Sequence, residues 1–155
     1  DREFAMVEGL TRNAARNIFF GGSLFFFLAF IGLTAHSHYY VVTESTDHAG
    51  LTDSVKRGKH IWEENSCINC HSLLGEGAYF APELGNVWKR YGGEGSPAGA
   101  RNALKAWIRI QPTGAEGRRQ MPKYDFTEEE LDALIDFLEW TSRIDTQDWP
   151  PNISG

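Results

Sequence analysis

Two cysteines and a histidine form the most chemically informative stretch of this chain, Cys67-Ile68-Asn69-Cys70-His71. The C-x-x-C-H spacing is the one that attaches a c-type haem covalently. Cysteines three positions apart on a helical turn present both sulfurs on one side, where they can form thioethers with the two haem vinyl groups. The imidazole of His71 then lies under the iron as an axial ligand. The sequence therefore predicts one covalent haem c on Cys67 and Cys70.

Other uses of the same residues fit less well. A structural zinc site usually needs four Cys or His ligands, and the chain has no further cysteine and no second pair of histidines at ligand spacing. A redox-active dithiol of the thioredoxin type needs a preceding strand and a βαβ context, whereas the flanking sequence has the pattern of helix and loop. The surroundings of the motif therefore favour haem attachment.

A long apolar segment precedes the motif. Residues 17–43 contain no Asp, Glu, Lys or Arg, and at about 1.5 Å per residue a helix of this length crosses a hydrocarbon core of about 30 Å. We therefore expect a transmembrane anchor helix over 17–43 that contacts membrane lipid, after an N-terminal segment 1–16. A signal peptide is the alternative, with Arg12 and Arg16 as its charged region, but Ala35-His36-Ser37 is a poor cleavage site.

The charges on either side of the anchor predict its orientation. Arg12 and Arg16 precede it, whereas Glu44 and Asp47 follow it, and basic residues favour the cytoplasmic side. We expect a single-pass protein of the bacterial inner membrane with a cytoplasmic N-terminus and a periplasmic haem domain. Covalent haem attachment in bacteria takes place on the periplasmic side, which is an independent argument for the same orientation.

Three helices are predicted beyond the membrane, after a linker over 44–52 that is rich in Thr, Ser, Asp and Gly. The first runs over about 53–64, and the second over about 96–111, from Ser-Pro to Pro112. The third opens at a capping box formed by Thr127 and Glu130 and continues to about residue 143. Strand signals are absent. In the first helix, one side carries Val55, Lys59 and Trp62. In the second, the residues expected to face inward are Leu104, Trp107 and Ile108, and in the third a single stripe is formed by Leu131, Leu134, Ile135 and Leu138.

Three or four short helices around a haem, joined by loops that contain Gly and Pro, resemble the class I cytochrome c fold. The resemblance implies an all-α haem domain over 53–155, with one transmembrane helix before it. The first and last helices of that domain would cross near the haem. At the crossing, Gly58 and Trp62 would meet Phe137 and Trp140.

Met121 is the predicted second axial ligand. The chain has two methionines, and Met6 lies before the membrane segment, where it cannot reach the haem. Met121 lies in a loop in the Met-Pro context of class I cytochromes c, and a thioether ligand raises the reduction potential, which suits electron acceptance. The alternative is a methionine that fills a gap in the core. By the same resemblance, Pro82 supplies the carbonyl that fixes the other ring nitrogen of His71, and Leu84 packs on the haem; a plain loop turn is the alternative there.

Longer stretches are similar to one family. The run Cys70–Asn86, the loop Gly117–Pro122 and the tail Ile144–Asn152 resemble the cytochrome c subunit of bacterial nitric oxide reductase, as does the Phe-rich anchor. The resemblance implies a heterodimer with a large integral-membrane catalytic subunit, which holds haem b and non-haem iron and reduces nitric oxide to nitrous oxide and water. This chain would accept electrons from a periplasmic cytochrome c or a cupredoxin donor. The resemblance also implies a calcium ion at the subunit interface, bound partly by Gly77 and Tyr79.

Charge and the remaining motifs limit the other functions. Residues 44–155 carry 12 Lys/Arg and 18 Asp/Glu, an acidic balance that would steer basic donors and repel nucleic acid, although solubility alone accounts for most of these charges. A haem subunit of a terminal oxidase, a free-standing anchored shuttle and a small-ligand sensor with an open iron position stay open as alternatives. No Ser-His-Asp arrangement, phosphate loop or carboxylate dyad stands out, so we expect no bond-making catalysis by this chain alone.

Overall fold

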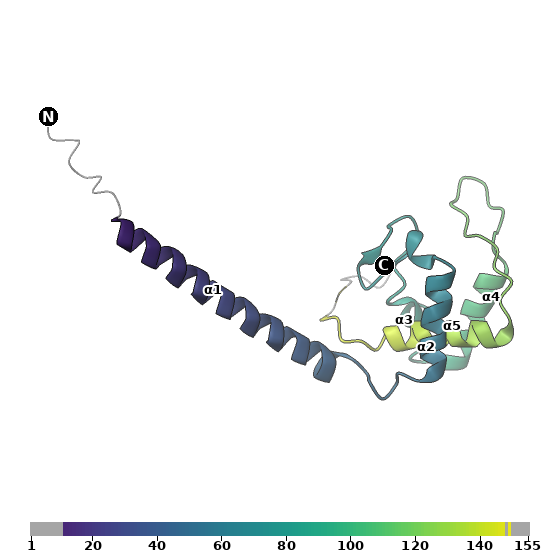
Figure 1. Cartoon of the computed structure of the whole chain (residues 1–155). Helices are drawn as coiled ribbons and strands as arrows, with labels where there is room; N and C mark the ends of the chain where they lie inside the picture. The colour runs from purple at the N-terminus through teal and green to yellow at the C-terminus, as the bar shows by residue number, and fades with distance from the viewer. Residues whose placement is uncertain (1–10, 148, 150–155) are drawn as a thin grey trace. The chain divides into compact units, whose positions relative to one another are not determined.

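The computed structural model describes residues 11–147 and 149, and the chain divides into two compact units at Thr43 and Glu44 (Figure 1). The first unit contains the helix α1 (Arg12–Tyr40), which continues as a π-helical segment, Val41–Ser45. The second contains the other helices and one short hairpin. Its elements are α2 (Asp53–Glu64), the 3-10 turn Cys67–Asn69, β1 (Ser72–Leu73), β2 (Glu76–Gly77), α3 (Val87–Arg90), α4 (Pro97–Arg109) and α5 (Glu128–Thr141).

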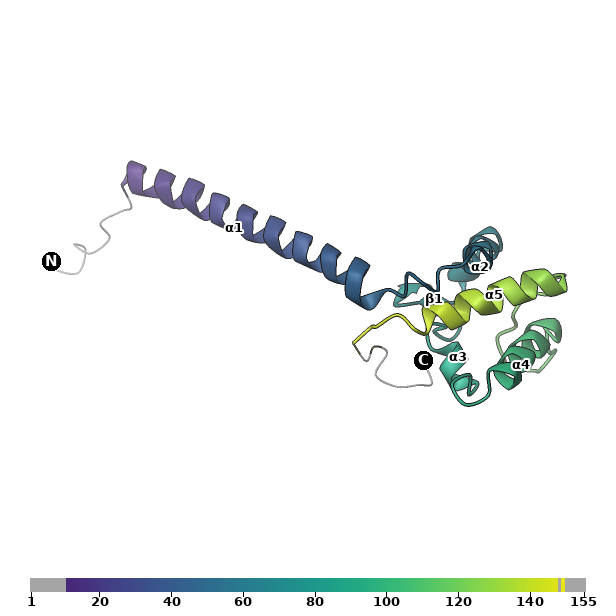
Figure 2. The same ribbon diagram turned by 90° about the horizontal axis from the view of Figure 1, so that it is seen from below.

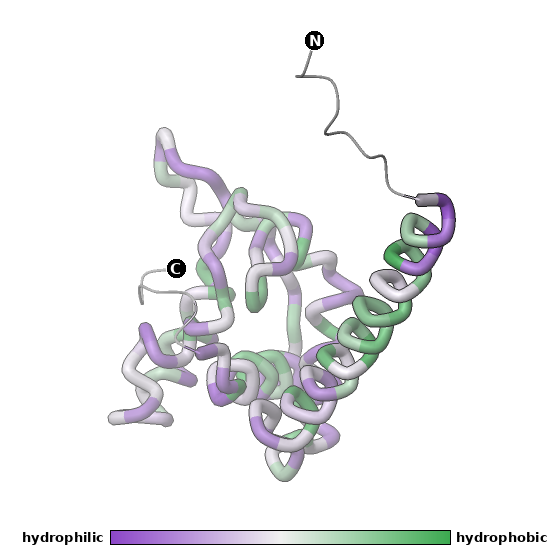
Figure 3. Tube along the Cα trace, turned by 90° about the vertical axis from the view of Figure 1, so that its left-hand side faces the viewer, coloured by the Kyte–Doolittle hydropathy of each residue, from purple (hydrophilic) through white to green (hydrophobic). Residues whose placement is uncertain are grey.

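The helix α1 is long and apolar enough to cross a membrane. Its N-terminus is capped by Thr11, whose hydroxyl accepts a hydrogen bond from the backbone N–H of Ala14 at 3.2 Å. Its 29 residues span about 44 Å. Large apolar side chains point outward along it, and Phe26 has 70% of its surface exposed; Figure 3 shows the hydrophobic stretch. A helix that exposes apolar side chains in this way is suited to a lipid environment, so the structure supports the predicted anchor.

The second unit is built on the crossing of α2 and α5. Thr52 caps α2 through Val55, and the predicted capping box of α5 is confirmed, because Thr127 and Glu130 exchange hydrogen bonds of 3.2 and 3.0 Å. At the crossing, a methyl group on Gly58 would lie 1.9 Å from the carbonyl oxygen of Ala133. Only a glycine therefore lets the two helices approach so closely.

The helix α5 packs against α2 on one side and α4 on the other (Figure 2). The rings of Trp62 and Phe137 lie 6.3 Å apart in the α2–α5 contact, as the resemblance implied. Trp140 instead donates its Nε1–H to the carbonyl of Asp47 at 2.8 Å, which fastens the segment before α2 to the end of α5. The buried apolar side chains of the core are Val55, Ile61, Trp62, Val87, Trp88, Ala100, Leu104, Ile108, Leu131, Ala133, Leu134, Ile135, Phe137 and Leu138.

Ion pairs border the same contacts on the outside. Arg101 of α4 reaches three carboxylates of α5, and Lys105 reaches two. From α2, Arg57 pairs with Glu130 at 3.4 Å. The carboxylates paired to α4 are Glu128, Asp132, Asp136 and Glu139. Basic side chains of α2 and α4 therefore neutralise much of the acidic face of α5.

Two residues of the predicted helix faces lie outside the buried core. Lys59 is exposed and pairs with Glu63 at 2.5 Å, because it lies about 100° around the helix from Gly58, the centre of the buried face. Trp107 keeps 44% of its surface exposed, because it lies at the edge of the stripe that Ala100, Leu104 and Ile108 form at four-residue spacing.

The sequence carries no strand signals, and the structure adds one short hairpin to the helices. β1 and β2 pair in an antiparallel hairpin, with Ser72 opposite Gly77 and Leu73 opposite Glu76. The turn between them, Leu74 and Gly75, has positive φ angles of 53° and 85°. Strands of two residues are too short to show the alternation by which a strand is recognised in a sequence.

Candidate haem site

The C-x-x-C-H motif folds into a tight turn directly after α2. The N–H groups of Cys70 and His71 both donate to the carbonyl of Cys67, at 3.1 and 2.9 Å. Ser66, which precedes the turn, has the left-handed φ angle of 54° that lets the chain leave the helix. The turn therefore presents both cysteines and the histidine from one short segment.

Both cysteines are free thiols and are partly buried. Desolvation raises the pKa of the Cys67 thiol to about 11, so this sulfur is a neutral thiol at neutral pH. A neutral, partly buried sulfur beside the apolar core suits a thioether bond to an apolar ring better than it suits a charged metal thiolate.

His71 has one ring nitrogen engaged and the other free for a ligand role. Its Nδ1 lies 2.8 Å from the carbonyl oxygen of Pro82, so Nδ1 carries the proton and Nε2 keeps its lone pair. Partial burial lowers the pKa of His71, and the hydrogen bond to Pro82 opposes that effect. The neutral imidazole is the form that binds iron, and a carbonyl on its second nitrogen fixes its orientation.

Met121 and Leu84 lie at the edge of the same core. Both are partly buried against it, and four further apolar side chains are packed against the core in the same way: Cys67, Leu73, Phe126 and Trp140. These half-covered side chains provide an apolar wall for a flat hydrophobic group. The site thus combines two cysteine sulfurs, a neutral imidazole with a free Nε2, a thioether and an apolar wall. This combination fits haem c.

The loop that carries Met121 is tied to the segment that follows the motif. The guanidinium of Arg119 lies 4.5 Å from the ring centroid of Phe80 and donates a hydrogen bond to the carbonyl of the same residue. Tyr124 stacks on Phe126 with ring centroids 5.1 Å apart. The pKa of Tyr124 is raised by desolvation and by the proximity of the two motif cysteines. The structure thus brings the two loops with the predicted ligands to one region.

Sequence reasoning missed Glu83 and Tyr124. Glu83 is buried, and its carboxylate accepts three backbone hydrogen bonds next to Pro82. Its place between Pro82 and Leu84 could have indicated a role near the haem, but no neighbouring residue indicates that this loop glutamate is buried. For Tyr124, the short spacing to Met121 was the signal.

Gly77, at the end of the hairpin, and Tyr79, in the turn that follows it, are both exposed. Gly77 has a φ angle of 118°, and a methyl group there would lie 2.4 Å from the carbonyl oxygen of His71. Tyr79 keeps 74% of its surface exposed and donates its hydroxyl to the carbonyl of Gly75 at 3.2 Å. Within residues 11–147 and 149, no three His, Cys, Asp or Glu side chains gather in a group that could hold a metal ion.

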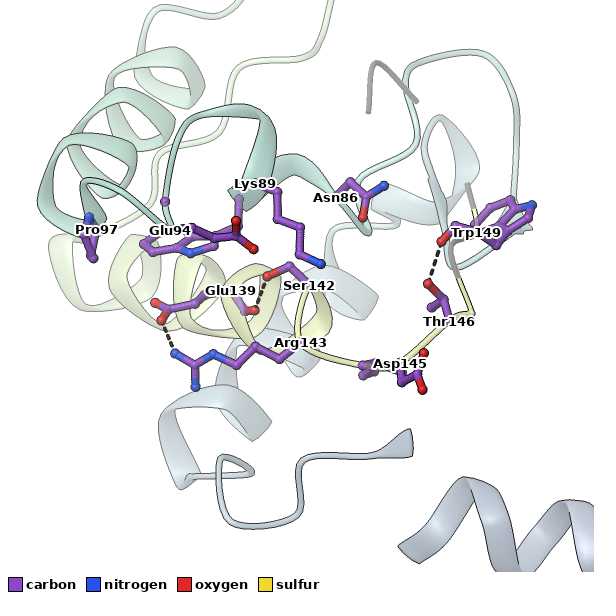
Figure 4. Close-up of a pocket in the computed structure, with 13 residues that line it drawn as sticks. Asn86, Lys89, Glu94, Pro97, Glu139, Ser142, Arg143, Asp145, Thr146 and Trp149 are labelled. Atoms are coloured by element: carbon purple, nitrogen blue, oxygen red, sulfur yellow. Dashed lines mark hydrogen bonds and ion pairs between the residues drawn. The ribbon is translucent and has the colours of Figure 1, made fainter. Parts of the chain in front are cut away.

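The described residues of the second unit line two pockets. The larger, of about 650 Å³, lies between α3 and the end of α5 and contains none of the predicted haem residues (Figure 4). Charged side chains line it, including Lys89, Glu94 and the Glu139–Arg143 ion pair, so it does not suit a porphyrin. The smaller, of about 410 Å³, extends from Tyr79 to Glu83 and includes Arg119.

Comparisons with known proteins identify a family and several relatives. The family model for cytochrome c matches residues 55–142. The chain is 69% identical over 150 residues to the C subunit of nitric oxide reductase from Halomonas halodenitrificans and 60% identical to that from Paracoccus denitrificans, in each case over 97% of this chain and 100% of the relative. It is 37% identical over 83 residues to cytochrome c oxidase subunit 2 of Alkalihalophilus pseudofirmus, which covers 53% of this chain and 24% of that protein.

Proposed function

This chain belongs to the family of nitric oxide reductase C subunits, and its outer part is a cytochrome c domain; we propose that it carries electrons from a periplasmic donor to the catalytic subunit of a nitric oxide reductase. The observation that carries the proposal is the full-length similarity together with a histidine whose Nδ1 is held 2.8 Å from a carbonyl oxygen. That arrangement suits a permanent iron ligand.

Haem c would be held by four residues of this chain. Cys67 and Cys70 would form the thioether bonds, and His71 and Met121 would bind the iron. When bound, haem c supplies one-electron redox chemistry. The partly buried positions of Cys67 and Met121 at the edge of the core and the free Nε2 of His71 support these roles.

Pro82 and Leu84 support the axial histidine. The carbonyl of Pro82 accepts the Nδ1–H of His71, which fixes the tautomer and makes the imidazole a stronger donor to iron. Leu84 contributes an apolar surface to the haem face, in keeping with its partly buried place at the core edge.

The membrane arrangement follows the sequence. Residues 1–16 are cytoplasmic, 17–43 form the anchor, 44–52 are a linker, and 53–155 form the periplasmic haem domain of a bacterial inner-membrane protein. The long exposed apolar helix supports the anchor, and the basic residues before it support this orientation.

The donor is a small periplasmic cytochrome c or a cupredoxin, and the acceptor is an integral-membrane catalytic subunit that contains haem b and non-haem iron. In that partner, two nitric oxide molecules, two electrons and two protons give one nitrous oxide and one water. This chain supplies the two electrons one at a time. It performs no bond-making step of its own.

The proposal includes a calcium ion at the subunit interface. Gly77 offers a backbone carbonyl and Tyr79 a phenol oxygen, and both residues are exposed at or just after the end of the hairpin. Calcium binds six to eight oxygen atoms. The partner subunit and the haem propionates would therefore supply most of the ligands.

A haem subunit of a terminal oxidase is the second candidate, and the similarity to cytochrome c oxidase subunit 2 favours it. That similarity covers about half of this chain, whereas the similarity to the nitric oxide reductase subunits extends over the anchor as well. The first candidate is therefore the better supported.

Co-purification tests the proposal. The chain is expressed in a denitrifying host and isolated from its membranes in detergent, together with any bound partner. A pyridine haemochrome spectrum of the isolated complex then counts haems c and b together. The expected result is a partner with haem b and non-haem iron that consumes nitric oxide when a reduced periplasmic donor is added. The double variant Cys67→Ala/Cys70→Ala is the control and should keep haem b but lose haem c and donor-driven turnover. A copper-containing partner that reduces oxygen would refute the proposal.

A further inference from the structure

Glu83 is a buried carboxylate next to the carbonyl that holds His71. Its residue surface is 5% exposed. Oε1 accepts hydrogen bonds from the N–H groups of Leu74 and Gly85, each at 2.8 Å, and Oε2 accepts one from Gly75 at 3.4 Å. Burying a charge costs free energy unless hydrogen bonds replace the lost water, and here three backbone donors do so.

The hairpin turn is shaped to receive this carboxylate. Leu74 has a φ angle of 53°, which a residue with a side chain rarely adopts, and Gly75 follows with 85°. Successive N–H groups in such a turn converge on one point and form a small anion-binding concavity. The anion that occupies this concavity is the side chain of Glu83.

The segment around Pro82 is held on both sides. The N–H of Ala81 donates to the carbonyl of Cys70 at 2.8 Å, and the N–H of Leu84 donates to the carbonyl of Ser72 at 2.9 Å. Pro82 has no N–H of its own, so its neighbours determine where its carbonyl points.

We infer that Glu83 is a positioning residue for the proposed iron ligand, because its buried carboxylate locks the Pro82 carbonyl onto the Nδ1–H of His71. The inference rests on the proposed haem ligation by His71. Glu83 acts through the backbone: the carboxylate binds the turn at Leu74 and Gly75 and thereby fixes the chain that follows Pro82. A second contact supports the same segment, since Nη2 of Arg90 donates to the carbonyl of Glu83 at 2.7 Å.

Hydrogen exchange at His71 tests the inference in the full-length holoprotein in detergent micelles. In the ferric protein, NMR detects the Nδ1–H of the iron-bound histidine as a hyperfine-shifted signal, and its exchange with deuterated solvent reports how firmly Pro82 holds it. Glu83→Ala removes three hydrogen bonds and should accelerate the exchange at least tenfold. Glu83→Gln keeps an amide oxygen for Leu74 and Gly85 but turns an N–H group toward Gly75, so it should accelerate the exchange by a smaller factor.

Glu76→Gln is the matched control. Glu76 is an exposed carboxylate of the same hairpin, so its loss changes the charge of the hairpin and leaves the turn intact. Equal acceleration in Glu76→Gln and Glu83→Ala, or wild-type exchange in Glu83→Ala, would overturn the inference. If Glu83→Ala yields no holoprotein, Glu83→Gln decides alone, and wild-type exchange in that variant overturns the role.

The wild type separates haem ligation by His71 from the role of Glu83. A wild-type spectrum without a hyperfine-shifted histidine signal would refute haem ligation by His71 and the inference with it. A normal wild-type spectrum combined with unchanged exchange in the variants would refute the role of Glu83 alone.

Discussion

Gly58 of α2 lies directly against the backbone of Ala133 in α5, so closely that an added methyl group would be 1.9 Å from the Ala133 carbonyl oxygen and 2.7 Å from Cβ of Phe137. The α2–α5 crossing is the largest contact in the second unit. This contact also aligns α2, whose last turn leads into the C-x-x-C-H motif. The geometry of the haem site therefore depends on a position without a side chain.

Gly58→Ala should destabilise the protein. Alanine gains about 1 kcal/mol of helix propensity over glycine, but overpacking against a backbone carbonyl that cannot rotate away costs about 3 kcal/mol. We expect the free energy of unfolding to fall by about 2 kcal/mol, measured by urea denaturation of the detergent-solubilised holoprotein.

Gly95→Ala is the control for that measurement. A methyl group at Gly95 would have its nearest neighbour, the carbonyl oxygen of Gly92, at 3.9 Å, which is an ordinary contact. The substitution should leave stability unchanged or raise it by about 0.5 kcal/mol through the unfolded chain. Equal losses at both positions would contradict the close approach at Gly58.

Met121→Leu should keep the haem attached but open one side of the iron. The ferric charge-transfer band typical of Met ligation should disappear, the reduction potential should fall, and the ferrous protein should bind carbon monoxide readily. Met6→Leu, which lies outside the described residues, is the control and should change none of these. A wild-type protein that already binds carbon monoxide rapidly would favour the sensor alternative, and an unchanged Met121→Leu spectrum would exclude Met121 as ligand.

Arg119→Gln should loosen the loop that carries Met121. The substitution removes the cation–π contact with Phe80 and the hydrogen bond to its carbonyl, together worth about 1 kcal/mol at this exposed site. We expect cyanide to displace Met121 from the ferric haem about fivefold faster, measured by stopped-flow absorbance. Arg118→Gln removes the neighbouring charge and should leave the rate within about twofold of the wild type; a similar acceleration there would assign the effect to charge alone.

Asp132→Asn should destabilise the protein in a pH-dependent way. The pKa of Asp132 lies below its ordinary value of 3.8, mainly because Lys105 donates a hydrogen bond to it at 2.5 Å. The unfolded chain therefore binds the proton first as the pH falls, so the contribution of Asp132 is complete above about pH 5 and disappears as the pH falls through the folded pKa. Its side chain is 44% exposed, which limits the effect to about 0.5 kcal/mol.

Urea midpoints at neutral and acidic pH measure this prediction. The difference between wild type and Asp132→Asn should be present at about pH 7 and should shrink as the pH falls below the ordinary pKa of 3.8 and through the lowered folded pKa. Asp125→Asn serves as the control, because Asp125 is 85% exposed in its pair with Lys123. A difference that persists unchanged at low pH would show that the carboxylate charge is not responsible.

The features that could be predicted from the sequence are those with local causes. The all-α class with one apolar N-terminal helix is confirmed, as are the extent of α2 and the capping box of Thr127 and Glu130, which depends on two side chains three residues apart. The cytochrome c fold is confirmed by the family match over residues 55–142. The grouping of Lys59 with Val55 and Trp62 on one face and the inward position of Trp107 were wrong, because the buried side of a helix is determined by its neighbours in space.

Among the residues of the haem site, those with a local sequence signal could also be predicted, and those that depend on distant contacts could not. The C-x-x-C-H motif is contiguous, so a spacing argument finds it, and the Met-Pro context finds Met121 by resemblance. The burial of Glu83 depends on a left-handed turn at Leu74 that brings N–H groups from an earlier segment. Such a partnership has no signature in the residues around Glu83 itself.

The basic side chains that border α5 have a consequence for diffusing partners. Arg101 and Lys105 lie within ion-pair distance of four carboxylates of that helix, so these two cations offset half of the negative charge of the four groups. Salt screens the remaining field beyond about 8 Å, the Debye length at physiological ionic strength. The formal charge of −6 therefore acts on a mobile protein only at short range, where the fit of the two surfaces determines the orientation of a productive encounter.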